Sequence, residues 1–140
     1  MFPTIPITGR QVYKETELCG YIVPGNSTIF VNILAAHHDP RYWDEPDRFD
    51  PDRFLPENAT GRHHCAYMPF GVGSRNCIGA QYAMMDLKTF LATTLRAYRV
   101  SPANDGHKDL KSLKDNMTFD VASRLVGGTK VIFTPRTAQV

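Results

Sequence analysis

A glycine-rich segment that runs into the longest helical pattern constrains the fold of this chain most. Residues 70–79 read Phe-Gly-Val-Gly-Ser-Arg-Asn-Cys-Ile-Gly, and a helical pattern follows over about residues 78–98. Apolar residues recur there at spacings of three and four, which predicts an amphipathic helix with one apolar stripe. We expect this stripe to pack in a core; its members are Ala83, Leu87, Phe90, Leu91, Leu95 and Tyr98.

The chemistry of the segment centres on Cys77, which stands at the N-terminal end of the predicted helix. Free N–H groups and the helix dipole favour an anion at such a position, and a thiolate is the form of cysteine that binds metals. Arg75 can present a fork of donors to a carboxylate, and Phe70 can shield the sulfur from water. Three glycines let the backbone turn tightly and approach a flat partner: Gly71, Gly73 and Gly79.

Known nucleotide-binding and nucleophile motifs do not match this segment. A dinucleotide fingerprint needs a glycine where Asn76 stands and a strand where Pro69 intrudes. A P-loop needs Gly-Lys-Ser/Thr, which is absent. A nucleophilic cysteine needs a positioned histidine; His63 and His64 are candidates, but nothing in the sequence fixes them in place.

The cysteines form no recognisable framework. Cys19, Cys65 and Cys77 are odd in number and irregular in spacing, so we expect free thiols and a reducing compartment. A zinc-binding module is an alternative function, because His63, His64, Cys65 and Cys77 are zinc-type ligands. We expect the His-His-Cys cluster not to converge on one ion, and no Cys-x-x-Cys pair is present.

Composition excludes several classes of protein. The 140 residues suffice for one small domain, and 16 basic against 14 acidic residues give no electrostatic case for nucleic acid binding. No apolar run approaches the roughly 20 residues that span a bilayer, and the N-terminus lacks the features of a signal peptide. The Pro-rich, extended opening resembles the middle of a chain, so we expect the tail of a larger protein.

The first half predicts β structure followed by turns. Residues 11–34 contain two β-rich runs that flank Pro24-Gly25-Asn26, which predicts a hairpin. Prolines recur every five or six residues over 39–57 among acidic side chains, which predicts an ordered meander of turns. Its expected core anchors are Tyr42, Trp43, Phe49, Phe54 and Leu55.

The second half predicts a closing hairpin. Residues 99–116 read as a polar connection. The runs 118–121 and 130–133 flank Gly127-Gly128 and are expected to pair. The fold class is therefore α+β: one long helix after the cysteine loop and small antiparallel sheets, without an internal repeat.

At this point the sequence resembles the cytochrome P-450 family. Residues 70–79 match its haem-binding signature, Phe-x-x-Gly-x-Arg-x-Cys-x-Gly, at every fixed position: Phe70, Gly73, Arg75, Cys77 and Gly79. In that family the cysteine thiolate is the axial ligand of the haem b iron and favours O–O cleavage. The resemblance implies Cys77 as the metal ligand. It implies a cofactor-binding set of Phe70, Gly71, Gly73, Arg75, Cys77, Gly79 and Arg10, and no catalytic residue.

The resemblance extends along the chain. Residues 50–54 resemble the family's meander motif, with Asp52 in place of the usual Glu. By resemblance Arg53 would pair with the Glu and Arg of the family's Glu-x-x-Arg helix, and Arg10 and Arg75 align with arginines that bind haem propionates. Residues 66–70 and 83–88 resemble microsomal members of the fatty-acid hydroxylase type. By the same resemblance, the family's Glu-x-x-Arg helix and its oxygen-activating acid–Thr helix lie outside these residues.

The resemblance implies a function and a place in the cell. Residues 1–140 would be the C-terminal haem-binding portion of one mainly helical cytochrome P-450 domain. The parent protein would be a haem-thiolate monooxygenase that inserts one oxygen atom from O₂ into a lipophilic substrate. Its electrons would come from an NADPH-dependent reductase, at the cytosolic face of the endoplasmic reticulum membrane, with an anchor outside these residues. The alternative is a truncated, non-catalytic haem-binding or interaction fragment.

Overall fold

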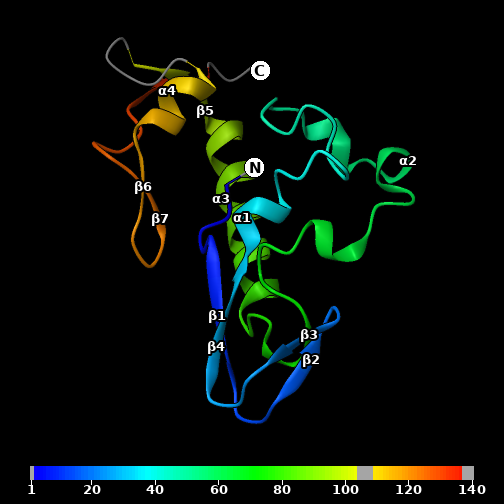
Figure 1. Cartoon of the computed structure of the whole chain (residues 1–140). Helices are drawn as coiled ribbons and strands as arrows, with labels where there is room; N and C mark the ends of the chain where they lie inside the picture. Colours follow the sequence, from blue (N-terminus) through cyan, green and yellow to red (C-terminus); the bar gives the residue numbers. More distant parts are fainter. Residues whose placement is uncertain (1, 104–108, 137–140) are drawn as a thin grey trace. The chain divides into compact units, whose positions relative to one another are not determined.

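The computed structural model describes residues 2–103 and 109–136, which divide into two compact units (Figure 1). Unit 1 comprises Met1–Pro69 with Phe119–Ser123, and unit 2 comprises Phe70–Thr118 with Arg124–Val140. Both units combine helices with small sheets, and each sheet among the described residues has two strands. The expected mixture of helix and small antiparallel sheets is therefore confirmed.

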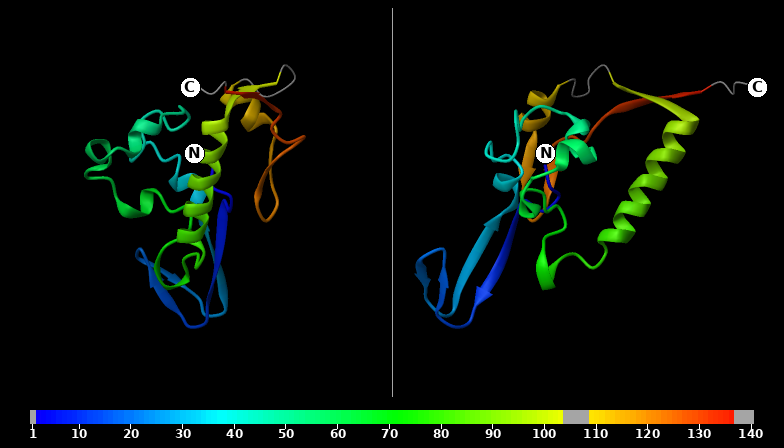
Figure 2. Two further views of the ribbon diagram at one scale, coloured as in Figure 1. Left: turned by 180° about the vertical axis from the view of Figure 1, so that it is seen from behind. Right: turned by 90° about the vertical axis from the view of Figure 1, so that its right-hand side faces the viewer.

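Two strand pairs open unit 1. Strand β1 (Ile7–Val12) pairs antiparallel with β4 (Ser27–Asn32), from Ile7 opposite Asn32 to Val12 opposite Ser27. Strand β2 (Thr16–Leu18) pairs with β3 (Tyr21–Val23). In both views of Figure 2 the short β2–β3 hairpin lies at one end of the longer β1–β4 pair.

The expected hairpin around Pro24-Gly25-Asn26 is wrong. Strand β3 pairs with the preceding strand β2 and not with β4, and β4 pairs with β1. The reason is the turn at Cys19 and Gly20, which have φ of 52° and 82°. Two successive residues with positive φ make a two-residue hairpin turn that matches the twist of its strands. The Pro-Gly-Asn segment instead connects one sheet to the other.

Short helical turns follow the sheets in unit 1. They are α1 (Ile33–Ala36), the 3₁₀ turn η1 (Pro51–Phe54), α2 (Pro56–Ala59) and the 3₁₀ turn η2 (His64–Ala66). Pro51 and Pro56 each occupy the first position of a turn, where proline's missing N–H costs no hydrogen bond. The Asp50 side chain caps η1 by accepting from the Asp52 N–H at 3.0 Å. The prolines therefore start turns along the meander.

The core of unit 1 is built around Trp43, which is 1% exposed. Its indole Nε1 donates to the carbonyl oxygens of Ala36 at 3.2 Å and Ala66 at 3.1 Å. The Arg62 guanidinium lies over the ring, 4.1 Å from its centre. Among the expected anchors Phe49 is wrong, because it is 85% exposed. The other three anchors are only partly covered: Tyr42, Phe54 and Leu55.

Unit 2 carries the longest helix of the described chain, α3 (Ala80–Ala97). The remaining elements are the 3₁₀ turn η3 (Gly73–Arg75), β5 (Tyr98–Pro102), α4 (Leu110–Asp115), β6 (Met117–Phe119), β7 (Ser123–Leu125) and β8 (Val131–Pro135). The tip of the β6–β7 hairpin is grouped with unit 1. There Ser123 bonds to the chain's opening residues: its N–H donates to the Thr4 oxygen and its hydroxyl to the Pro3 oxygen, both at 2.7 Å.

The expected closing hairpin is also wrong. Strand β6 pairs with β7, and β8 pairs antiparallel with β5, with Pro102 opposite Val131. Gly127 and Gly128, with φ of 76° and 71°, lie between β7 and β8 and redirect the chain toward β5. The polar connection expected over 99–116 holds most of β5 and all of α4, and its residues 104–108 lie outside the described part.

The apolar stripe of α3 is not a core in this structure. None of its residues is buried, and Phe90 and Leu95 are 62% and 48% exposed. Period-3.6 patterning identifies the face that avoids water, but burial needs a second layer of structure. The described residues of unit 2 do not supply that layer, so the expectation of a buried stripe is wrong here.

A buried histidine links α1 to the segment that leads out of unit 1. His37 is 1% exposed, and its Nε2 accepts a hydrogen bond from the Met68 N–H at 2.9 Å. Its ring lies 5.0 Å from that of Tyr67. Burial lowers the pKa of His37 from 6.5 to about 4, because the charged ring would lose its hydration.

This histidine makes the stability of unit 1 depend on pH. The folded pKa lies below the unfolded one, so the unfolded chain binds the extra proton between pH 6.5 and about 4. The effect of His37 is therefore to keep the free energy of unfolding at its highest above pH 6.5. It lowers that free energy by up to about 3 kcal/mol as the pH drops toward 4. Urea unfolding followed by circular dichroism at several pH values measures this.

The matched variants are His37→Asn, which cannot titrate, and His64→Asn at an exposed position. We expect His37→Asn to flatten the profile between pH 6.5 and 4, and His64→Asn to keep the slope of the unmodified chain. An unchanged slope in His37→Asn would contradict the assignment.

Candidate functional site

The cysteine segment folds as a loop closed by its own backbone. The Cys77 N–H donates to the Phe70 oxygen at 2.8 Å, and the Asn76 N–H donates to the Gly73 oxygen at 3.2 Å. Helix α3 follows directly, with Gly79 as its N-cap. The loop therefore holds Cys77 two residues before the cap, at the positive end of the helix.

Glycine is required at two turns of this loop. Gly71 and Gly73 have φ of 72° and 79°, in the left-handed region that side chains of L-residues disfavour. Gly79 has an ordinary φ of −87°, so its role is different. A Cβ added there would stand 3.9 Å from the Cys77 Sγ, on the surface beside the thiol.

The loop presents its functional groups to solvent. Cys77 is an exposed free thiol, and the Ile78 side chain after it is fully exposed. Arg75 is exposed too, and its guanidinium has no hydrogen bond or ion pair within the described part of the chain. Phe70 is half-buried at the start of the loop. A sulfur ligand and a guanidinium two residues apart are thus available to one external group.

Six of the seven expected cofactor-binding residues lie together on this loop of unit 2: Phe70, Gly71, Gly73, Arg75, Cys77 and Gly79. The seventh, Arg10, belongs to unit 1, on β1 opposite Ile29. Its Nη1 donates to the Thr8 hydroxyl at 3.0 Å and to the Gly9 oxygen at 2.8 Å. The place of Arg10 beside the loop stays a prediction.

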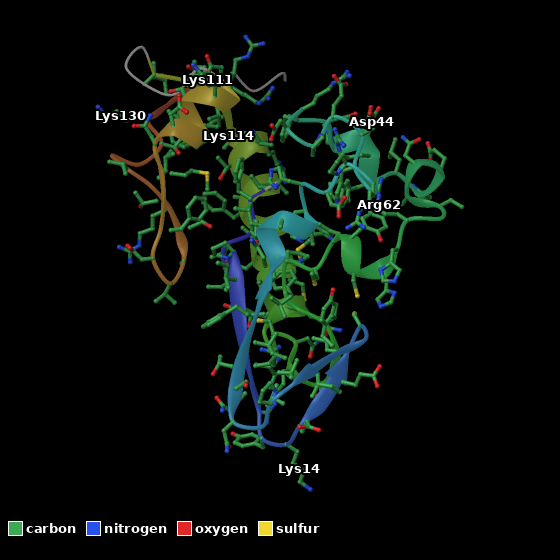
Figure 3. All side chains as sticks on the ribbon, viewed as in Figure 1. Lys14, Asp44, Arg62, Lys111, Lys114 and Lys130 are labelled. Carbon is green, nitrogen blue, oxygen red and sulfur yellow. The ribbon has the colours of Figure 1, made fainter. Side chains whose placement is uncertain are left out.

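Arg53 of the meander is partnered by backbone. Its guanidinium donates to four carbonyl oxygens, those of Asp44 (2.7 Å), Glu45, Arg48 and Asp50 (each 3.2 Å). It borders a polar hollow of about 390 Å³ that Asp44 and Arg62, labelled in Figure 3, also line. These carbonyls offset the positive charge within unit 1 and hold the meander in shape.

The histidine cluster corrects another expectation. Ligand atoms of His63, His64 and Cys65 all lie within 4.8 Å of one another, so the three side chains do converge. His63 is also fixed, because its Nδ1 accepts from the Cys65 N–H at 3.1 Å. The signal in the sequence was the adjacency of three ligand-type residues; what it lacked was the 3₁₀ turn η2 that gathers them.

Cys19, Cys65 and Cys77 are all free, which confirms the absence of disulfides. Among the described residues, none of the helices is both long and apolar enough to cross a bilayer.

Comparison with known proteins identifies relatives of this chain. The family model described as Cytochrome P450 matches residues 1–122. Probable cytochrome P450 4p3 of Drosophila melanogaster is 46% identical over 106 residues, which cover 75% of this chain and 21% of that protein. Cytochrome P450 4c3 of the same organism is 38% identical over 136 residues, or 97% of this chain and 24% of that protein.

A vertebrate relative is similar to this chain to a comparable degree. Cytochrome P450 4V2 of Rattus norvegicus is 43% identical over 98 residues, which cover 70% of this chain and 19% of that protein. The chain spans about a fifth to a quarter of the length of the curated relatives it matches. The similarity is therefore to one part of those proteins.

The loop geometry predicts different costs for two alanine substitutions. Gly73→Ala places a side chain at φ 79° and should cost about 1–2 kcal/mol of loop stability. Exchange of the Cys77 amide hydrogen, measured by NMR, should then be roughly 5–30 times faster than in the unmodified chain. Gly79→Ala, at an ordinary φ and with only van der Waals contact, should leave that exchange unchanged. Equal protection in both variants would contradict the role given to Gly73.

Proposed function

Because the chain belongs to the cytochrome P450 family, we propose that it is the C-terminal haem-binding portion of a haem-thiolate monooxygenase. Members of this family are monooxygenases that hold haem iron through a cysteine thiolate. The proposal assigns the thiolate of this chain to Cys77.

One observation carries the assignment. Cys77 is exposed on a loop that the 2.8 Å bond from its own N–H to the Phe70 oxygen closes. The thiol therefore projects from a fixed backbone and has an open approach. The N-terminal end of α3 follows at once, so a negatively charged ligand bound at Cys77 would lie at the positive end of the helix.

The residues around Cys77 fit the haem group. When bound, haem supplies the activation of O₂ for insertion of one oxygen atom into the substrate. Gly79 carries no Cβ beside the sulfur, so a flat macrocycle can approach there. To Phe70, half-buried at the start of the loop, we assign the role of limiting water near the sulfur once haem is bound, which would tune the potential of a thiolate-ligated iron.

Two arginines are proposed as partners of the haem propionates. Arg75 is exposed on the loop, and its planar guanidinium matches a carboxylate with two parallel hydrogen bonds. Arg10 on β1 is the second; its Nη1 bonds to Thr8 and Gly9 restrain the direction of the side chain. A propionate would place a negative charge beside each of these cations.

For the whole protein we propose the oxidation of a lipophilic substrate, with a fatty-acid-like chain as the first class to test. Its electrons would come from NADPH through a reductase, at the cytosolic face of the endoplasmic reticulum membrane. Support comes from the similarity to relatives named cytochrome P450 4p3 and 4c3. For the 140-residue chain alone, the second candidate is haem binding without catalysis, which the uncovered apolar face of α3 favours.

A haemin titration tests the ligand assignment. The reduced, carbon-monoxide-bound complex of the chain should show the strongly red-shifted Soret band of thiolate ligation. Cys77→Ala should abolish that band, because no sulfur then reaches the iron. Cys19→Ala removes another exposed free thiol and should leave the band intact.

Two results of this titration would count against the proposal. A red-shifted band that persists in Cys77→Ala would show that another residue ligates the iron. Loss of the band in both Cys77→Ala and Cys19→Ala would show that the band does not report specifically on ligation by Cys77.

The role of Arg75 is tested with two porphyrins. Arg75→Ala should weaken haemin binding by about ten- to hundredfold, the usual worth of a charged hydrogen bond. The dimethyl ester of haemin lacks the propionate charges, so its affinity should be the same for the variant and the unmodified chain. Equal loss of affinity for both porphyrins would mean that Arg75 only supports the loop.

A further inference from the structure

We propose that His63, His64 and Cys65 form a surface binding site for Zn²⁺. Their ligand atoms all lie within 4.8 Å of one another. The site requires neither haem nor Cys77, so it stands apart from the proposed function.

The ligand chemistry suits zinc. Two imidazole nitrogens and one thiolate sulfur are the donors that Zn²⁺ and similar borderline ions prefer over Mg²⁺ or Ca²⁺. Bonds of about 2.0–2.3 Å in a tetrahedron bring ligand atoms to about 3.5 Å apart. The separations, none above 4.8 Å, therefore need to close by no more than about 1.3 Å, which rotation of three surface side chains can supply.

The backbone that carries these ligands is already folded. The Ala66 N–H donates to the His63 oxygen at 2.9 Å, which closes the turn η2. Ala66 is 2% exposed, and its oxygen accepts from the Trp43 indole. On the other side Arg62 donates to the oxygens of Arg53 and Asn58, at 3.0 Å each. Zinc would thus bind a turn anchored at both ends, at a small cost in chain entropy.

The side chains are open to an incoming ion. His63 and His64 are exposed and Cys65 is partly so, and the two rings stack with centres 4.5 Å apart. The guanidinium of Arg62, the adjacent cation, is committed to backbone oxygens and to the Trp43 ring. Three protein ligands leave a fourth position for water, as in zinc sites that remain accessible.

Binding exchanges one hydrogen bond for a metal bond. In the metal-free chain the His63 Nδ1 accepts from the Cys65 N–H. Ligation through Nδ1 replaces that donor directly. Ligation through Nε2 moves the ring proton to Nδ1 and breaks the same bond. Either way the Cys65 N–H, in an exposed turn, passes to water.

The test uses the reduced 140-residue chain and zinc itself. We expect one Zn²⁺ per chain by competition with a chromophoric chelator. Affinity should fall more than tenfold in Cys65→Ser and in His64→Gln, and should be unchanged in Cys19→Ser and Cys77→Ser. Co²⁺ in place of Zn²⁺ should give a thiolate-to-metal charge-transfer band that disappears only in Cys65→Ser.

A second measurement needs no variant, so it stands even where a substitution disturbs folding. Zn²⁺ should slow the alkylation of Cys65 by iodoacetamide, and leave that of Cys19 unchanged, when both are followed by peptide mass spectrometry. The proposal is overturned by no binding, by one zinc shared between two chains, or by binding that survives Cys65→Ser. Equal protection of both cysteines overturns it as well.

Discussion

The first unit depends on how one indole is bonded. Trp43 Nε1 is shared between the carbonyl oxygens of Ala36 and Ala66, so it joins the end of α1 to the turn η2. Arg62 covers one face of the ring with its guanidinium. Burying a polar N–H in this way is favourable only because both acceptors are in place. The short elements of the meander, which have little core of their own, gain a common fixed point from this residue.

The two halves of the candidate site differ in what holds them. The cysteine loop is fixed by backbone bonds between Phe70 and Cys77 and by glycines in the left-handed region, so its shape is local. The helix that follows satisfies its own hydrogen bonds but leaves its apolar stripe exposed. A ligand-presenting loop can therefore be preformed while the packing around it is not, which separates binding geometry from core stability.

The sequence predicts local features far better than pairings. The tight loop at residues 70–79 and the helical period after it depend on neighbours in the chain, and α3 spans Ala80–Ala97 where the pattern indicates 78–98. Strand partners are not local. The sequence predicts a strand at Tyr21–Val23, but the turn at Cys19 and Gly20 pairs it with the preceding strand β2 and not with the following one. The expectation that Trp43 is a core anchor is confirmed, since it is buried. Its bonding partners, and the convergence of the His63–Cys65 cluster, depend on contacts that no periodicity encodes.

The pairing of β5 with β8 has a consequence for chain length. Pro102 lies opposite Val131, so the paired strands close the chain between these two residues into one large loop. The entropy of closing such a loop grows only with the logarithm of its length, by about 0.6 kcal/mol for each doubling. Added residues in the glycine turn between β7 and β8 therefore cost little closure entropy, as long as the strand ends can still meet.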